Sequence, residues 1–392
     1  MTQSLQKPLF DTTPAPAPLA GRTALEFFAG VGLARMGLEQ AGWRVVFAND
    51  LDPAKRQMYE ANFGPDRHLS GEDIHRLADR PGELPAATLA HASFPCTDLS
   101  LAGARRGLDA GQSSAFWGFH KLLHQLGASR PPLVLLENVT GFLSSHGGKD
   151  FHAALAALNE LGYAVDAFVL DAAHFVPQSR PRLFVVGVAE GLESEGESPP
   201  PAPTTLRPAK LLAAMEAAAD IHWCVRDLPE PPTYAETRLE AVLEDPPEGS
   251  PEWWNDHRAE YLLNQMSDRH RAIADEMIAG RRHTYGTVFR RVRNGKSMAE
   301  LRTDGLAGCL RTPKGGSGRQ ILFRGGRGEY AVRLLSPREC ARLMGAGGFR
   351  IEASLNQALF GFGDDVCVDC IQWIAENYLN PIADQVAPAA AG

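Results

Sequence analysis

The stretch LEFFAGVG, residues 25–32, ends an apolar run and opens an amphipathic stretch. The apolar run predicts a strand and the amphipathic stretch predicts a helix, so the turn between them follows the carboxyl end of a strand. Gly30 and Gly32 let the backbone approach a ligand closely there, and the start of the helix presents N–H groups that lack helical partners. This stretch therefore predicts an α/β fold with a ligand site at the turn.

Alternating apolar runs and amphipathic stretches continue to residue 190 and predict strand–helix–strand units around a mostly parallel, doubly wound sheet. The expected strands are residues 23–28, 44–49, 88–93, 133–137, 164–170 and 183–188, and the expected helices are residues 33–41, 53–62, 113–126 and 151–161. After residue 191 the chain is rich in Glu, Ser and Pro, which is typical of a linker, and an Arg- and Gly-rich region follows. Past Leu334 the apolar periodicity returns.

This texture predicts a domain organisation in five parts. We expect a disordered leader (1–20), a main cofactor-binding domain (21–190), a smaller irregular domain with its Pro-rich linker (191–330), a return to the main domain (331–380) and a disordered tail (381–392).

The composition is that of an ordinary globular protein, with 44% hydrophobic and 22% charged residues. The sequence shows neither a signal peptide nor an apolar run long enough to cross a membrane, so we expect a cytoplasmic protein without a membrane partner. Its six cysteines are too sparse for a disulfide framework. Cys367 and Cys370 form one CxxC without a second pair, which favours two buried residues over a zinc site, and we expect no metal.

Charge is distributed unevenly along the chain. The net charge is −8, yet residues 281–350 contain 16 Lys and Arg against 4 Asp and Glu. A basic segment in an acidic chain is typical of a face that binds phosphates, although a solvated basic face without a partner is the alternative. The candidate nucleic-acid contacts are Arg290, Arg291, Arg293, Arg311, Lys314 and Arg319.

Two acidic residues are candidates for the ligand site. Asp50 lies about twenty residues beyond the Gly turn, at the end of the second expected strand, where an acid commonly binds ribose hydroxyls. The turn lacks the full GxGxxG pattern, which favours an adenosine ligand without a pyrophosphate but leaves NAD open. Asp73 could accept a hydrogen bond from an adenine amino group, or it could cap the helix that begins at Ile74.

The candidate catalytic residues follow expected strands. Cys96 comes after the strand at 88–93 and begins a polar loop, which favours a nucleophile over the small buried hydrophobe that a lone cysteine usually is. Glu137 ends the apolar run LVLLE, where a desolvated carboxylate can handle protons, although a solvated strand terminus is the alternative. Arg180 and Arg182, in the segment QSRPR, carry guanidinium forks suited to a carboxylate or a base carbonyl.

Taken in order, FFAGVG, Asp50, FPCTDLS, ENV, QSRPR, RLLSPRECARL and FGDDV resemble the motifs of the DNA cytosine-5 methyltransferase family. The resemblance covers most of residues 22–190 and 333–380 and implies a Rossmann-like domain that depends on S-adenosylmethionine. The variable stretch between them would be the target recognition domain. It also implies a substrate of double-stranded DNA methylated at a specific sequence, a monomer, and a place in a restriction–modification or phage-defence system.

The resemblance further implies a role for each matched residue. Cys96 would add to C6 of a flipped cytosine, Glu137 would hold or protonate N3, and Arg182, with Arg180 nearby, would brace Glu137 and the base O2. Ser100 and Asn138 would support them. On the cofactor side, Phe28 would pack on the adenine, Gly30 and Gly32 would make room for the methionine moiety, and Asp50 would bind the ribose.

Two departures and two alternatives accompany the resemblance. Phe94 stands where the family has a second Pro before Cys96, and Asp364 stands where it has Asn. A tRNA cytosine-5 methyltransferase on the same fold is one alternative, although the long basic region favours DNA. A catalytically silent DNA-binding protein is the other, and the retention of Cys96 and Glu137 with both arginines argues against it.

Overall fold

The computed structural model describes residues 21–65, 68–95, 115–192, 202–233, 238–293, 295–312 and 318–386. The expected leader therefore lies outside the described residues, as do Cys96 and Lys314. The chain divides into two compact units, each described here by itself. The α/β unit comprises the described residues of Ala15–Asp171, Pro181–Pro231 and Val368–Gly392, and the antiparallel unit comprises those of Ala172–Arg180 and Pro232–Cys367.

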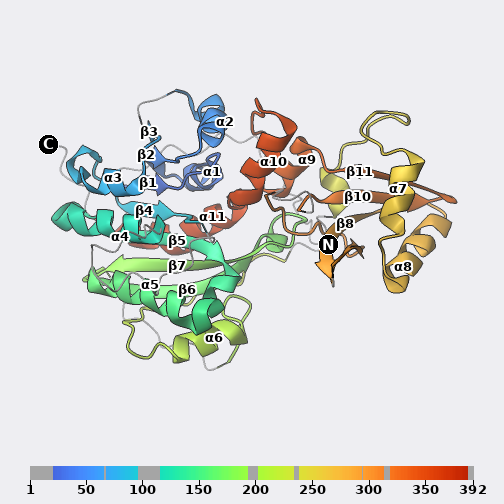
Figure 1. The fold of residues 1–392 in the computed structure, drawn as a ribbon. Coiled ribbons are helices and arrows are strands. Elements are labelled where there is room, and N and C mark those ends of the chain that lie inside the picture. Colours follow the sequence, from blue (N-terminus) through green and yellow to red (C-terminus); the bar gives the residue numbers. More distant parts are fainter. Residues whose placement is uncertain are drawn as a thin grey trace, which may run out of the picture. The chain divides into compact units, whose positions relative to one another are not determined.

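The α/β unit is built on a seven-stranded sheet in the order β3-β2-β1-β4-β5-β7-β6 (Figure 1). The strands β1 to β5 run parallel, whereas β7 is antiparallel to both of its neighbours. They are β1 (Thr23–Phe27), β2 (Arg44–Asn49), β3 (Leu69–Ser70), β4 (Leu89–Ala92), β5 (Leu133–Val139), β6 (Tyr163–Asp171) and β7 (Pro181–Ala189). All six expected strands are present, and the mostly parallel sheet is confirmed.

Helices cover both faces of this sheet, as a doubly wound fold requires. On one face, α3, α4, α5 and α6 pack onto the apolar side chains of β1, β4 and β5. On the other, α1 packs against α11, where a Cβ at Gly37 would lie 2.5 Å from the carbonyl of Val368. These helices are α1 (Leu33–Gln40), α3 (Ile74–Ala78), α4 (Ala115–Leu126), α5 (Lys149–Glu160), α6 (Ala209–Glu216) and α11 (Val368–Ile374), with α2 (Pro53–Phe63) following β2.

The C-terminal segment is ordered further than the sequence indicates. The helix α12 (Asn380–Ala383) extends into the residues where we expected a disordered tail, and Asp384 forms an ion pair with Arg22 at 2.7 Å. Asn380 accepts a hydrogen bond of 2.7 Å from the indole of Trp43. The segment is therefore fastened to the start of the α/β unit through residues 380–384.

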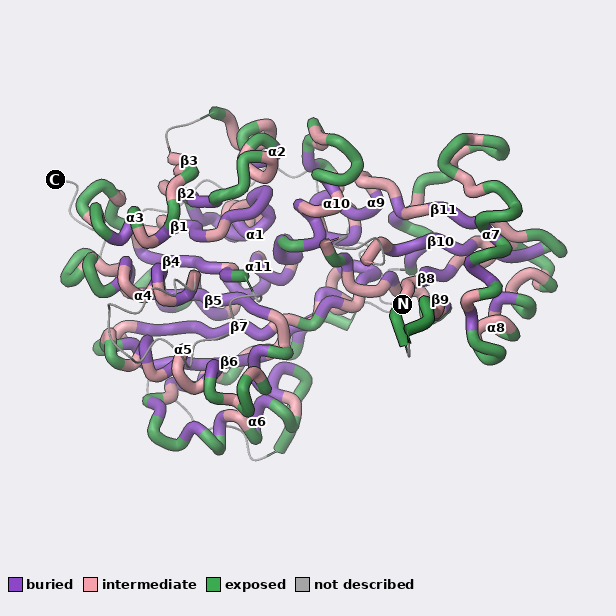
Figure 2. Tube along the Cα trace, viewed as in Figure 1, coloured by how far each residue is buried: buried purple, intermediate pink, exposed green. Residues whose placement is uncertain are grey.

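The antiparallel unit contains a second sheet in the order β11-β10-β8-β9. Its apolar face is buried under α7 and α8, and the buried residues include Leu262, Val288, Ile321 and Phe323 (Figure 2). The elements are α7 (Asp256–Leu263), α8 (Asp268–Ala279), β8 (Thr284–Arg293), β9 (Lys296–Arg302), β10 (Ile321–Gly326), β11 (Glu329–Leu334), α9 (Pro337–Leu343) and α10 (Leu355–Asp364). Residues 331–367, which the sequence assigns to the main domain, group with this unit.

Tight hairpins make this unit more regular than the expected irregular domain. Arg293 pairs with Lys296, so two residues connect β8 to β9, and the second of them, Gly295, has a φ of 75°. Gly326 pairs with Glu329 across a turn in which Arg327 and Gly328 have φ values of 60° and 84°. Two-residue turns with positive φ match the twist of antiparallel strands, which explains the Gly-rich texture.

Within the described residues, no helix is both long and apolar enough to span a membrane.

Candidate active site

The turn after β1 is held by its neighbouring strand. The backbone N–H of Gly30 donates to Oδ2 of Asp50 at 2.8 Å, and the N–H of Ala29 donates to the carbonyl of Asn49 at 2.9 Å. Phe28 has a φ of 57° and Gly30 has a φ of 60°. A positive φ is costly for a bulky residue, so the turn keeps Phe28 in a conformation that its surroundings must enforce.

Asp50 is the buried acid of this site. It is 8% exposed, and its Oδ1 accepts a second backbone hydrogen bond, from Asp52 at 2.8 Å. Burial raises the pKa of Asp50, while Lys55 and the two backbone donors act in the opposite direction. A carboxylate has about four acceptor positions, so Asp50 can still accept hydrogen bonds from a ligand's hydroxyl groups.

Leu51 is a neighbour that sequence reasoning missed. It follows Asp50 directly and is 63% exposed, which makes it one of few large hydrophobic side chains so exposed among the described residues. An exposed apolar side chain beside a buried acid offers a surface for an aromatic ring. Its adjacency to Asp50 at a strand's carboxyl end was the available signal.

Two other predicted cofactor residues have structural roles. A Cβ at Gly32 would lie 2.8 Å from Cδ2 of Tyr59 and closer still to the ring of Phe63, so this glycine permits α2 to pack against the turn. Asp73 caps α3 by accepting a hydrogen bond of 2.9 Å from the N–H of His75. In the structure Asp73 is therefore the N-cap of α3, which is the alternative to an adenine contact that the sequence left open.

The chain that leads to Cys96 is anchored at Phe94. The Phe94 ring lies 5.4 Å from that of Phe116 and 5.7 Å from that of Phe142, centroid to centroid, within the buried core. Its carbonyl accepts a hydrogen bond of 3.2 Å from Nδ2 of Asn138, which is 4% exposed. This packing buries the Phe94 ring and fixes the described chain up to Pro95.

Glu137 and Arg182 form an ion pair at the ends of neighbouring strands. Nε of Arg182 lies 3.0 Å from Oε1 of Glu137, and the two side chains are 14% and 8% exposed. Glu137 lies opposite Phe184 in the β5–β7 ladder, and Arg182 lies opposite Val139. The structure thus brings together two of the four predicted catalytic residues.

Arg180 lies elsewhere, within the antiparallel unit. It is 2% exposed, and its guanidinium donates to the carbonyls of Leu310 at 2.9 Å and Gly363 at 3.1 Å, and also to that of Asp365. Sequence reasoning missed Gln178, which is fully buried and bonds to the backbone of Leu310 at 2.9 Å. Both side chains therefore hold separate backbone segments of the unit together.

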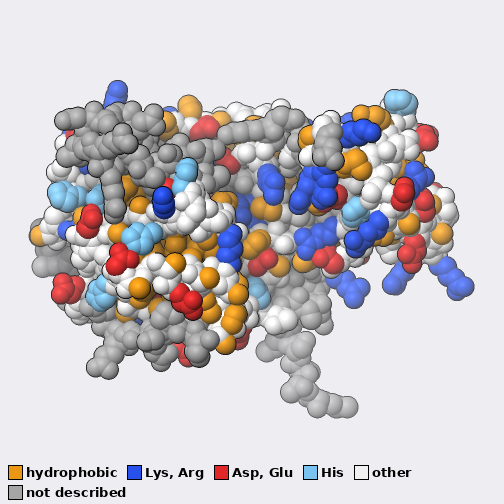
Figure 3. Space-filling view, turned by 60° about the horizontal axis from the view of Figure 1, so that its bottom comes forward, with side chains coloured by type: hydrophobic (Ala, Val, Ile, Leu, Met, Phe, Trp, Pro, Cys, Tyr) orange, Lys and Arg blue, Asp and Glu red, His pale blue; other side chains and the backbone are white. Residues whose placement is uncertain are grey.

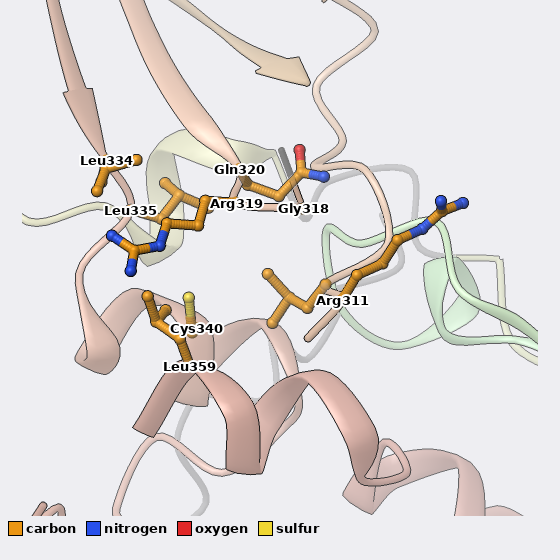
Figure 4. Close-up of a pocket in the computed structure, with 9 residues that line it drawn as sticks. Arg311, Gly318, Arg319, Gln320, Leu334, Leu335, Cys340 and Leu359 are labelled. Carbon is orange, nitrogen blue, oxygen red and sulfur yellow. The ribbon is translucent and has the colours of Figure 1, made fainter. Parts of the chain in front are cut away.

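Basic side chains gather over the antiparallel unit in Figure 3. Arg293 and Arg291 are paired with Glu300, at 2.6 and 3.7 Å respectively. Arg311 and Arg319 line a small pocket, and their guanidinium groups point away from each other (Figure 4). The predicted DNA contacts therefore differ in how far their charge is already neutralised.

Comparison with known proteins identifies the family. The model of the C-5 cytosine-specific DNA methylase family matches residues 23–380. The Type II methyltransferase M.HhaI of Haemophilus parahaemolyticus is 26% identical over 92% of this chain and 94% of its own length. A DNA-cytosine methyltransferase of Escherichia coli (strain K12) is 28% identical over 97% of this chain and 82% of its own.

Solved structures show the same fold. The Dnmt2 methyltransferase of S. pombe matches with a TM-score of 0.60 at 17% identity, over 92% of this chain and 98% of that one. The family match spans both units of the molecule, including the Gly turn and the Glu137–Arg182 pair. The chain therefore belongs to the C-5 cytosine-specific DNA methylase family and is a DNA cytosine methyltransferase.

Proposed function

We propose that this enzyme methylates C5 of a cytosine within a specific sequence of double-stranded DNA, by covalent attack of Cys96 on C6 of a flipped base. The desolvated Glu137–Arg182 pair, which joins the carboxyl end of β5 to the start of β7, is the observation that carries this proposal. C5 of cytosine is a weak nucleophile, and addition of a thiolate at C6 converts the ring into an enamine that can take a methyl group.

In this scheme Glu137 acts on the base while Arg182 controls Glu137. A carboxyl group that holds or protonates N3 withdraws electrons from the ring as Cys96 attacks C6. Arg182 keeps the buried Glu137 oriented through its bond of 3.0 Å. After methyl transfer, loss of the C5 proton releases the Cys96 thiolate and restores the aromatic ring.

We assign Asn138 the role of positioning the chain segment that leads from β4 to Cys96. It bonds to the carbonyl of Phe94, two residues before Cys96. Precise placement of reacting groups within a few tenths of an ångström is worth several kcal/mol in such reactions.

The methyl donor we assign is S-adenosylmethionine, which supplies an electrophilic methyl group. The residues present fit an adenosine: Asp50 retains acceptor positions for ribose hydroxyls, and exposed Leu51 offers an apolar surface for the adenine. Phe28 would pack against the other side of that ring. Gly30 would leave room for the methionine moiety because its backbone carries no Cβ.

We further propose the antiparallel unit as the target recognition domain. Its basic side chains suit a DNA partner, since phosphate contacts position a duplex while base-edge contacts select its sequence. The target base must leave the stack at a cost of a few kcal/mol. Relatives named Type II methyltransferases support a role in a restriction–modification or phage-defence system. The oligomeric state that we propose is a monomer.

The test is transfer of labelled methyl from S-adenosylmethionine to duplex DNA and to tRNA in parallel. We expect label on DNA with the wild type and none with Cys96→Ser, and bisulfite sequencing then gives the modified site. Glu137→Gln provides a second variant, expected to keep DNA binding while losing methyl transfer. Label on tRNA alone would establish the alternative substrate, and label on neither would favour the silent binding protein.

A further inference from the structure

The start of α1 is capped by a side chain from a neighbouring strand. Its own N-cap residue, Gly32, makes no side-chain hydrogen bond to the helix, and the first turn contains no acidic residue. Instead, the backbone N–H of Arg35 donates to Oε1 of Glu26 on β1, at 3.1 Å. A carboxylate at this end of a helix pairs an N–H group that has no helical acceptor and complements the helix dipole. Glu26 thus supplies the cap that a glycine cannot provide.

Glu26 is buried on the face of the sheet that α1 covers. Its neighbours in β1, Leu25 and Phe27, belong to the core on the opposite face, and alternation along the strand therefore directs Glu26 towards α1. Its exposed fraction is 0%. A buried carboxylate costs free energy unless hydrogen bonds compensate it, so a carboxylate at this position requires partners on the neighbouring helices.

Tyr59 of α2 is a second partner of this carboxylate. Its hydroxyl donates to Oε2 of Glu26 at 3.5 Å and accepts from Nη1 of Arg35 at 3.1 Å. Burial, followed by the negative charge of Glu26, raises the pKa of Tyr59, so the hydroxyl keeps the proton that it donates. Glu26 is therefore joined to α1 directly and to α2 through Tyr59.

These contacts hold the Gly turn at both of its ends. Residues 28–32 lie between Glu26 and Arg35 in the chain, so one side chain connects the strand that enters the turn to the helix that leaves it. The turn includes Phe28, whose positive φ must be enforced by its surroundings. Because Glu26 has no exposed surface, it acts on the shape of the turn rather than on a ligand.

We propose that Glu26 is a positioning residue for S-adenosylmethionine: it holds the start of α1 against β1 and keeps the Gly turn in the conformation that binds the methyl donor. This inference rests on the proposed function, in which S-adenosylmethionine is the assigned donor. A preformed turn binds more tightly because less ordering of the chain accompanies binding. Loss of the Glu26 carboxylate should therefore weaken binding of the cofactor and leave binding of DNA unchanged.

The experiment measures the Kd of S-adenosylmethionine by isothermal titration calorimetry, and amide hydrogen exchange over residues 27–36 of the cofactor-free enzyme. The variants are Glu26→Gln, which loses the charge and one of the two acceptor oxygens, and Glu26→Leu, which loses both oxygens. All titrations are run well below the melting temperature of the least stable variant.

The matched control is Asp166→Asn. Asp166 is a fully buried carboxylate on β6, the edge strand of the same sheet, and it is paired with Arg207 at 2.9 Å. Its replacement removes a buried charge from the same unit, so it should lower stability without changing the turn. Anisotropy with a labelled duplex gives the Kd for DNA of every variant.

We expect Glu26→Leu to weaken S-adenosylmethionine binding about tenfold, the scale of one hydrogen bond to a charged group. Glu26→Gln should lose less affinity, because its remaining oxygen can still accept from the N–H of Arg35. In both variants amide exchange over the turn should be faster, and KM for S-adenosylmethionine should rise by a larger factor than kcat falls. The Kd for DNA should stay at the wild-type value.

Wild-type affinity and exchange in both Glu26 variants would overturn the inference, as would the same result in Glu26→Gln alone if Glu26→Leu does not fold. An equal loss of cofactor affinity in Asp166→Asn would overturn it too, because the effect would then follow overall stability. A wild type that does not bind S-adenosylmethionine would instead defeat the proposed methyl donor together with the inference.

Discussion

Arg180 and Arg182 are separated by one proline in sequence but have different surroundings. The Arg182 side chain pairs with a carboxylate, whereas that of Arg180 donates to backbone carbonyls around residues 310 and 363–365. Alternation along an extended segment sends residues i and i+2 to the same face only where the strand is regular, and here the strand begins at Pro181. A guanidinium group can bind a carboxylate or backbone carbonyls. Its chemistry alone therefore does not predict which of these partners an arginine has in the fold.

Replacing each arginine with lysine should therefore have a different effect: Arg180→Lys should lower stability, and Arg182→Lys should lower activity. We expect Arg180→Lys to lower the free energy of unfolding by about 2–4 kcal/mol, because a compact ammonium lacks the planar five-donor fork that reaches three carbonyls and leaves buried acceptors unpaired. Arg182→Lys should leave stability within about 1 kcal/mol and reduce kcat at least tenfold. Urea unfolding and methyl-transfer kinetics on both variants distinguish these roles, and the reverse pattern would contradict the assignment.

Gly32 couples the cofactor turn to α2. Its φ of 93° is unfavourable for alanine, and the added Cβ would overlap Phe63 and Tyr59. We expect Gly32→Ala to destabilise the protein by about 2–4 kcal/mol through strain and overpacking, and to weaken S-adenosylmethionine binding. Thermal melting and cofactor titration check this, with Gly148→Ala as the control, since Gly148 has a similar left-handed conformation (φ of 87°) and a Cβ there would meet only the Leu143 carbonyl oxygen, at 3.6 Å. An equal loss in that control would mean that φ alone matters.

Among the elements, the parallel strands were predictable and the antiparallel ones were not. A strand such as β5 is buried on both faces, so its sequence is a continuous apolar run that stands out. By contrast β10 reads ILFRGG, and its glycines are required by close packing: a Cβ at Gly326 would lie 2.6 Å from the Arg282 carbonyl carbon. Glycine in a sequence usually indicates a turn, so the sequence of β10 resembles that of a loop and the strand was not predicted.

The candidate site, like the fold, could be predicted only in part from the sequence. Order along the chain identified Asp50 and Glu137 because strand ends are readable from sequence. Gln178 was missed because its role arises from a hydrogen bond to Leu310, 132 residues away, which no local pattern contains. Exposed Leu51 was missed because exposure depends on tertiary packing.

The β8–β9 hairpin gives a prediction at the scale of an element. Glu300 neutralises part of the charge of Arg291 and Arg293, so Glu300→Gln should release both for phosphates. We expect DNA affinity to rise severalfold at low salt and the salt slope to steepen by up to about one contact. Glu329→Gln, which makes the same change in net charge within the unit, is the control. An identical gain in the control would show that net charge, not the hairpin, governs binding.

For the molecule as a whole, buried polar groups link stability to pH. His91, in the middle of the sheet on β4, is 1% exposed, and its Nδ1 is buried without a hydrogen-bond partner. Burial lowers the pKa of His91 from 6.5 to about 4. Between those values the unfolded chain binds a proton that the folded chain does not, so stability rises with pH across this window.

The wild type should accordingly lose stability as the pH falls from about 6.5 towards 4, and this contribution should level off below the folded pKa. Replacing His91 with leucine removes the titrating group, so His91→Leu should lose less stability than the wild type between about pH 7.5 and 4.5, by on the order of 2–3 kcal/mol. Urea unfolding at both pH values measures the difference, and His124→Leu, at an exposed position of α4, is the control. Because only the change with pH matters, any effect of repacking at neutral pH cancels. Equal acid sensitivity of His91→Leu and the wild type would show that other ionisable groups govern acid unfolding.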